Sequence, residues 1–124
     1  MKAEKTGKKH KVLIVEDSKA WSSIIRRGLG DKASVLCAYD LIEGARIFME
    51  NQDIALVVMD ACVPGDEPNA QLLVREIRKT FNGPIIAMSS LEKFRKVLLA
   101  SGCDYEVEEK SQVTEKVFEL LGIS

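Results

Sequence analysis

Residues 55–69 have the sequence ALVVMDACVPGDEPN. Five apolar residues run directly into a single carboxylate, Asp60, and Pro64 and Gly65 follow within five positions. A continuous apolar run bounded by turn residues is typical of a strand buried on both faces. A carboxylate at the end of such a strand is a turn residue, a helix cap or a reactive group, and the rest of the chain decides between these interpretations.

Short apolar runs and helical patterns alternate five times along the chain. The expected strands are 12–15, 34–38, 54–59, 84–88 and 105–107, and the expected helices are 18–29, 40–51, 69–80, 91–101 and 112–121. Ser18 and Asp40 have the chemistry of N-caps, and Gly30 that of a helix stop. Strands that alternate with helices predict an α/β fold with right-handed crossovers, here a doubly wound five-stranded parallel sheet.

The composition is that of one ordinary globular domain. Of the 124 residues, 46% are apolar and 30% are charged. The longest apolar run has five or six residues, which predicts no membrane insertion, and the basic N-terminus lacks the apolar segment of a signal peptide. We therefore expect a cytoplasmic protein, with a flexible basic tail over residues 1–10 and a single domain over residues 11–124.

The charge is unevenly distributed. The first eleven residues contain five lysines and one glutamate, which leaves 13 basic and 18 acidic side chains in residues 12–124, a net charge of −5. A body of that sign is a poor partner for a phosphate backbone, so we expect no direct nucleic-acid binding.

The cysteines do not form a chemical motif. Cys37, Cys62 and Cys103 are far apart with no CxxC pair, and the one histidine, His10, lies in the basic segment. Zinc, thiol-protease and dithiol redox sites therefore lack their components, and reduced thiols are expected.

Polar residues follow four of the five expected strands. Glu16 and Asp17 follow the first, Asp60 the third, Ser89 and Ser90 the fourth, and Lys110 the fifth. In an open α/β sheet the ligand crevice lies beyond the carboxyl ends of the strands, so these side chains are expected at one edge.

This set of residues has a definite chemistry. Three carboxylates close together repel one another unless a cation lies among them, and Mg²⁺ suits a site of few carboxylates with room for water and phosphate. An aspartate can act as a nucleophile and form an aspartyl phosphate. A lysine and a metal ion would then neutralise the phosphoryl charge, and a serine would donate a hydrogen bond to it.

The order VLIVEDS, LVVMDACVPG, PIIAMSS and EEKS resembles the receiver domain of two-component response regulators over about residues 11–122. The resemblance implies the CheY-like, flavodoxin-like fold of this superfamily. It also implies a bacterial phosphorelay phosphoprotein that is not an enzyme beyond its own phosphorylation and dephosphorylation.

The resemblance assigns the metal-binding roles residue by residue. Asp60 would be the phosphoacceptor and would also contact the metal, Mg²⁺ or Mn²⁺. Asp17 would bind the metal directly, Glu16 mainly through water, and Cys62 through its backbone carbonyl.

The resemblance also assigns the phosphoryl-binding and switch roles. Ser89 would be the switch hydroxyl and Lys110 would pair with the phosphoryl group. Tyr105 fits the switch aromatic by its place after Gly102, whereas counting back from Lys110 places Val107 there.

The resemblance implies two kinds of partner. A histidine kinase or a histidine phosphotransfer protein would supply the phosphoryl group. A downstream protein or a second copy of the chain would bind the face made by the fourth helix, fifth strand and fifth helix. No output domain follows within these 124 residues, so we expect output by protein contact or by onward transfer.

Three features depart from the family pattern. Lys110 lies about one residue late and precedes Ser111 where proline is usual, which predicts a bulged or shifted fifth strand. The loop after Asp60 is about two residues longer than usual, and Ser90 replaces a small alanine or glycine.

Structural interpretations of the same residues remain open. Glu16 and Asp17 could cap a helix, Ser89 could be an N-cap, and Lys110 could be an exposed ion-pair partner. The alternative function is therefore a phosphorylation-independent interaction module with the same fold. A haloacid-dehalogenase-like phosphatase is excluded because it needs an acid at the position of Cys62.

Overall fold

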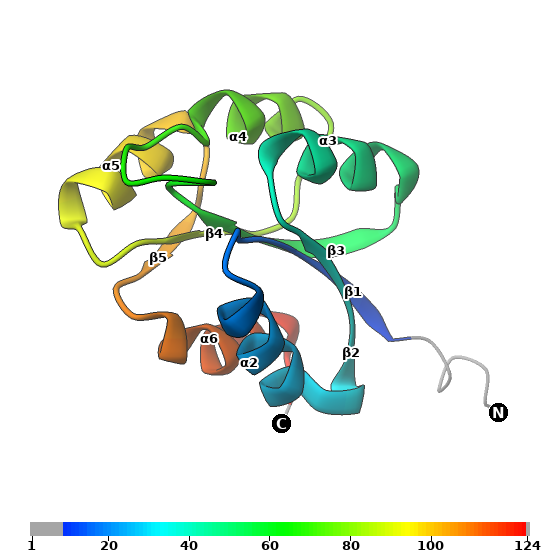
Figure 1. The fold of residues 1–124 in the computed structure, drawn as a ribbon. Helices are drawn as coiled ribbons and strands as arrows, with labels where there is room; N and C mark the ends of the chain where they lie inside the picture. The colour runs from blue at the N-terminus through cyan, green and yellow to red at the C-terminus, as the bar shows by residue number, and fades with distance from the viewer. Residues whose placement is uncertain (1–8, 124) are drawn as a thin grey trace, which may run out of the picture.

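Five parallel strands form one sheet in the computed structural model, which describes residues 9–123 (Figure 1). The strand order is β2-β1-β3-β4-β5. The strands are β1 (His10–Val15), β2 (Ala33–Ala38), β3 (Ile54–Asp60), β4 (Ile85–Met88) and β5 (Tyr105–Val107). The predicted doubly wound parallel sheet is confirmed.

Helices cover both faces of this sheet (Figure 1). The helices α3 (Leu41–Glu50), α4 (Gln71–Arg78) and α5 (Glu92–Ser101) lie on one face, and α2 (Lys19–Leu29) and α6 (Val113–Leu121) lie on the other. Successive strand residues such as Leu13 and Ile14 pack into opposite layers, which is why the strands are apolar throughout. No helix in the described part of the chain is both long and apolar enough to cross a membrane.

The expected helix ends at α2 and α3 are confirmed. Ser18 Oγ accepts a hydrogen bond from the backbone N–H of Trp21 at 3.1 Å, and Asp40 Oδ1 accepts one from Glu43 N–H at 2.7 Å. Gly30 ends α2 with φ of 60° and begins the 3-10 turn η1 (Gly30–Lys32). Glycine adopts this left-handed conformation without the steric cost that a Cβ would bring.

All five helices begin later than the expected ranges, α4 by two residues and the others by one. Helix α4 begins at Gln71 because Asn69 is used to close the preceding loop. Helix α6 follows the 3-10 turn η2 (Lys110–Gln112), which a reciprocal capping box between Glu109 and Gln112 stabilises. Of the predicted tail, residues 1–8 lie outside the described residues, and β1 already includes His10.

The prediction of a bulged or shifted fifth strand is wrong. Strand β5 pairs with β4 in an unbroken register, with Ile86 opposite Tyr105 and Met88 opposite Val107. The additional length before Lys110 falls after the strand, in residues 108–109. The one cis peptide bond within residues 9–123 precedes Pro64, so the bond before Ser111 is trans.

Candidate functional site

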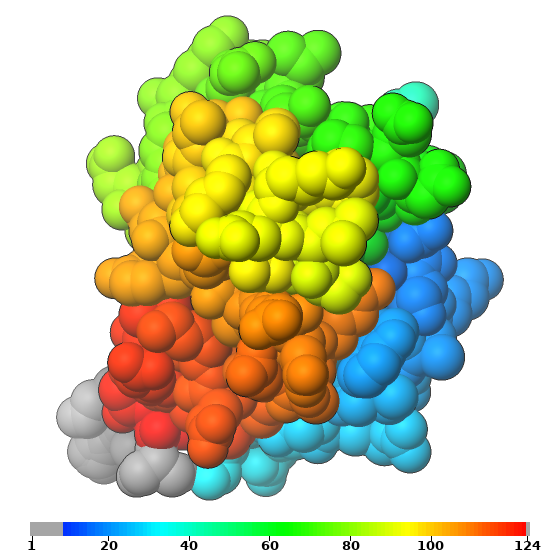
Figure 2. Space-filling model, turned by 90° about the vertical axis from the view of Figure 1, so that its left-hand side faces the viewer, coloured from blue at the N-terminus to red at the C-terminus, as the bar shows by residue number. Residues whose placement is uncertain are grey.

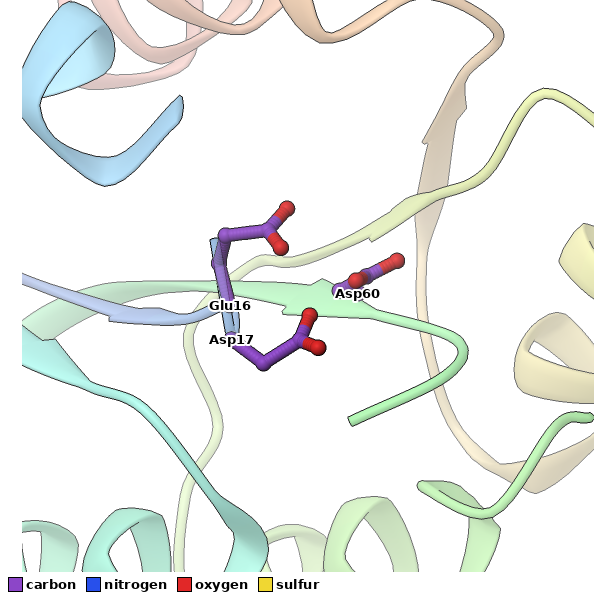
Figure 3. Close-up of side chains that lie close together, drawn as sticks. All are labelled: Glu16, Asp17 and Asp60. Atoms are coloured by element: carbon purple, nitrogen blue, oxygen red, sulfur yellow. The ribbon is translucent and has the colours of Figure 1, made fainter. Parts of the chain in front are cut away.

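Three carboxylates converge where the strand order reverses, at the carboxyl ends of β1 and β3. Glu16 and Asp17 directly follow β1, and Asp60 is the last residue of β3. Each offers an oxygen within 4.8 Å of those of the other two, and Figure 3 shows the carboxyl groups of Glu16 and Asp17 turned toward the side of Asp60. The helices that follow β1 and β3 lie on opposite faces of the sheet, which opens a crevice between the ends of these two strands.

Glu16 is fully buried but only partly hydrogen-bonded. Its Oε2 accepts a hydrogen bond from Ser18 N–H at 2.9 Å. Its Oε1 lies 2.5 Å from Lys110 Nζ as an ion pair, without the geometry of a hydrogen bond. Among the described residues, the ammonium of Lys110 is therefore the one basic group paired with this buried carboxylate.

The surroundings of Asp60 disfavour its ionised form. Burial, and then the negative charge of Glu16, raise the pKa of Asp60 from 3.8 to about 7. Lys110 Nζ, 3.8 Å from Asp60 Oδ2, acts in the opposite direction but does not cancel the effect. A hard divalent cation with oxygen ligands would relieve this repulsion, so the donor set fits Mg²⁺.

A cavity of about 310 Å³ adjoins these carboxylates. Every predicted site residue except Tyr105 lines it, and its walls are formed by Glu16, Asp17, Ser18, Asp60, Cys62, Gly65, Asp66, Ser89, Ser90, Leu91, Phe94 and Lys110. Tyr105 begins β5 and lies instead beside Lys116, whose Nζ is 5.0 Å from the ring centroid. Val107, the other candidate for the switch aromatic position, is buried in the core.

Ser89 and Lys110 reach the cavity from neighbouring elements. Ser89 follows β4, is largely buried, and accepts a hydrogen bond at Oγ from Leu91 N–H at 3.2 Å. Lys110 opens η2 with its side chain 25% exposed, and it turns inward to Glu16 rather than pairing with the acids before it. The helix-entry contact of Ser89 is compatible with binding a phosphoryl oxygen, because helix N-termini favour anions.

Sequence reasoning did not place five residues of the cavity wall in the site: Ser18, Gly65, Asp66, Leu91 and Phe94. Asp66 comes from the long loop after Asp60, whose extra length was the available signal. Burial, and then the negative charge of Asp60, raise the pKa of the Cys62 thiol, which disfavours the reactive thiolate.

A larger groove of about 490 Å³ lies between α4 and α5, away from this cluster. Arg75 is the only charged residue in its wall, and no group of titratable side chains converges there. Size alone would favour this groove, but the concentration of carboxylates makes the smaller cavity the candidate site.

No protein-family model and no curated protein matches the chain, but many solved structures do. A two-component response regulator from Clostridium difficile matches with a TM-score of 0.78 at 22% identity, over 92% of this chain and 97% of its own. The receiver domain of a Pseudomonas aeruginosa sensor histidine kinase, with a magnesium ion coordinated in its active site cleft, matches at 0.75 and 22%, over 93% and 99%.

A response regulator from Burkholderia pseudomallei with a phosphorylated aspartic acid, a calcium ion and citrate matches with a TM-score of 0.76 at 15% identity. That match covers 90% of this chain and 66% of the other. At these identities the likeness shows the arrangement of the chain in space. The chain has the CheY-like fold of response regulator receiver domains.

Proposed function

We propose that this chain is a phosphoacceptor receiver domain that takes a phosphoryl group on Asp60. The observation that carries the proposal is the placement of a buried Asp60 among Glu16, Asp17 and Lys110 at the point where the strand order reverses. The cavity beside it provides room for a phosphoryl group. The solved receiver with a phosphorylated aspartic acid, which shares the fold, supports this chemistry.

The metal in this proposal is Mg²⁺, with Mn²⁺ as a substitute. Asp17 and Asp60 would hold it directly, Glu16 mainly through water, and Cys62 through its backbone carbonyl. When bound, the metal supplies positive charge that offsets the carboxylates and the incoming phosphoryl oxygens. Four carboxylates and one ammonium line the cavity, so the described residues leave a charge imbalance that a divalent ion would reduce.

The chain's own residues would carry out a simple displacement. A carboxylate oxygen of Asp60 attacks the phosphorus of a phosphohistidine, forming a P–O bond as the P–N bond breaks. The donor nitrogen keeps the bonding electron pair and takes a proton. Lys110 Nζ and Ser89 Oγ would donate hydrogen bonds to the phosphoryl oxygens.

A histidine kinase or a histidine phosphotransfer protein would supply the phosphoryl group, in the cytoplasm. The signal would leave through the face made by α5, β5 and α6, as contact with a downstream protein or a second copy of the chain. In Figure 2, α5 and the segment from β5 to α6 are neighbours on one continuous surface. The proposed role is signalling, with no catalytic turnover of another substrate.

The test is covalent modification by a small phosphodonor. The protein is incubated with Mg²⁺ and acetyl phosphate, and its intact mass is compared with that of Asp60→Asn. We expect the parent to gain one phosphoryl group and Asp60→Asn to gain none. Asp31→Asn, which removes an exposed aspartate in η1, is the matched control and should gain the group as the parent does.

One observation favours a second function. Lys110 already pairs with the buried Glu16, and Ser111 stands where the family has proline. A phosphorylation-independent interaction module could use the same fold with this ion pair fixed. No mass gain, together with no Mg²⁺-dependent change in the fluorescence of Trp21, would favour this module and contradict the first proposal.

A further inference from the structure

The loop of residues 61–70, between β3 and α4, is closed by one side chain. Asn69 Oδ1 accepts a hydrogen bond from Val63 N–H at 2.8 Å, and Asn69 Nδ2 donates to Val63 O at 3.1 Å and to Pro64 O at 3.2 Å. The backbone N–H of Asn69 also donates to Ala61 O at 3.0 Å. A single residue thus ties the end of the loop to the segment that directly follows Asp60.

The orientation of the Asn69 amide is determined by its partners. Val63 presents both a donor and an acceptor to the same side chain. If the amide oxygen and nitrogen were exchanged, Val63 N–H would face an NH₂ group and Val63 O would face a carbonyl oxygen. Only an asparagine or glutamine side chain offers this pair of groups, and aspartate retains the acceptor alone.

The hydrogen bond to Val63 N–H also sets the direction of the carbonyl of Cys62. Cys62 C=O and Val63 N–H belong to the same peptide unit, which is planar and trans, so the two groups point in opposite directions. When Asn69 Oδ1 holds the N–H, the carbonyl of Cys62 is directed away from Asn69. Cys62 lines the cavity with Glu16 and Asp60, and Asn69 does not.

We infer that Asn69 is a positioning residue, which holds the Cys62 carbonyl in place as a ligand for the divalent cation. This inference rests on the proposed function, because it needs a metal among the carboxylates. Asn69 itself touches neither the metal nor the phosphoryl group. Residues 64–67 are exposed, so the longer loop can bulge outward while Asn69 keeps the segment 61–63 fixed.

The test measures binding of Mg²⁺ alone to the intact chain by titration calorimetry, with hydrogen exchange of the Val63 amide as a second readout. We expect Asn69→Ala to weaken Mg²⁺ affinity about tenfold or more, since residues that orient metal ligands commonly have effects of this size. The Val63 amide should exchange faster in the same variant. Asn69→Asp, which keeps the acceptor, should stay closer to the parent in both measurements.

Asn51→Ala is the matched control. Asn51 Nδ2 donates to Ile47 O at 2.9 Å at the end of α3, just before β3 begins and thus at the opposite edge of the sheet. Its loss should leave Mg²⁺ affinity and Val63 exchange unchanged. If Asn69→Ala does not fold, Asn69→Asp decides: retained affinity with a protected Val63 amide supports the inference, and loss of both overturns it.

The outcomes distinguish a failure of the positioning role of Asn69 from a failure of the proposed phosphoacceptor function. A parent that binds no Mg²⁺ overturns both. A parent that binds Mg²⁺, with Asn69→Ala binding it equally well, overturns the positioning role alone. Equal losses in Asn69→Ala and Asn69→Asp would also overturn it, because the acceptor for Val63 N–H would then make no difference.

Discussion

Two clusters of charged side chains lie at opposite edges of the sheet, and the fold satisfies them to different degrees. At the amino ends of β4 and β5, the guanidinium of Arg78 is saturated with acceptors. It donates to Gly102 O, Phe81 O, Gly83 O and Asp104 Oδ2. Asp104 Oδ2 also accepts a hydrogen bond from Ile85 N–H at 2.9 Å.

The cluster at the carboxyl ends of the strands is left unbalanced. Asp60 has a raised pKa, and the single ammonium of Lys110 faces the four carboxylates of the cavity wall. A cluster that only stabilises the fold would be expected to be neutralised and fully hydrogen-bonded, as Arg78 and Asp104 are. The contrast indicates that the Arg78–Asp104 cluster stabilises the fold, whereas the carboxylate cluster around Asp60 keeps groups that could bind a cation.

Removing Arg78 should have the largest effect on stability. Arg78→Ala leaves three backbone carbonyls without the guanidinium donor and the Asp104 carboxylate with the hydrogen bond from Ile85 N–H, and we expect a loss of about 2–4 kcal/mol in the free energy of unfolding. Urea denaturation measures this loss. Arg75→Ala, an exposed arginine one turn earlier on α4, should change it by less than about 0.5 kcal/mol. If Arg78→Ala and Arg75→Ala lowered the free energy of unfolding equally, the hydrogen bonds of Arg78 would not contribute specially to stability.

Neutralising Asp60 should raise the free energy of unfolding, whereas removing Arg78 should lower it. The folded pKa of Asp60, about 7, lies above its ordinary value of 3.8, so the folded state binds more protons in between. The parent should therefore lose stability as pH rises from about 4 to about 7 and beyond. In the absence of divalent ions, we expect Asp60→Asn to be more stable than the parent at pH 8 by about 1–3 kcal/mol.

Thermal and urea unfolding at pH 5 and pH 8 measure this difference. At pH 5 the folded carboxyl is protonated but the unfolded one is already largely ionised, so part of the loss is present and the gain from Asp60→Asn should be about half of that at pH 8 or less. Mg²⁺ should stabilise the parent at pH 8 and much less at pH 5, because the proton and the metal compete for Asp60. If the stability of the metal-free parent does not fall between pH 5 and pH 8, the pKa of Asp60 is not raised in the folded state.

Much of the carboxylate cluster could be predicted from the sequence, because its signal was local. The continuous apolar runs, and the polar residue after each, placed Glu16, Asp17, Asp60 and Ser89 at one edge, since parallel strands deliver their carboxyl ends together. The caps Ser18 and Asp40 were predictable because capping depends on a few adjacent residues.

The remainder depends on contacts that sequence spacing does not reveal. The register of β5 is regular because the extra residue before Lys110 lies in residues 108–109, between β5 and the turn η2. Arg78 and Asp104 are 26 residues apart, so their pairing leaves no local pattern. The hydrogen bonds of Asn69 to Val63 and Pro64 could not be predicted either, because a long loop with two prolines predicts a turn but not which side chain closes it.

The ion pair of Glu106 with Arg95 should contribute the least to the free energy of unfolding among the charged groups compared. Arg95 Nε donates to Glu106 Oε1 at 2.8 Å, and this bond, with a second one from Lys96, holds the pKa of Glu106 below its ordinary value. Its contribution is therefore present above about pH 4.5 and is lost as pH falls through the folded pKa. Because Glu106 is 32% exposed, we expect Glu106→Gln to cost only about 0.5 kcal/mol at pH 7, and less in 1 M salt.

Glu92→Gln, an exposed glutamate in the first turn of α5, is the control for the loss of one charge. Urea denaturation at low and high salt distinguishes the two variants. Arg95 also donates to Ser89 O at 2.8 Å and keeps that contact in Glu106→Gln, which limits the damage near the site. A cost as large as that of Arg78→Ala would mean that pairing alone, and not the number of hydrogen bonds made, sets the strength of a charged cluster in this fold.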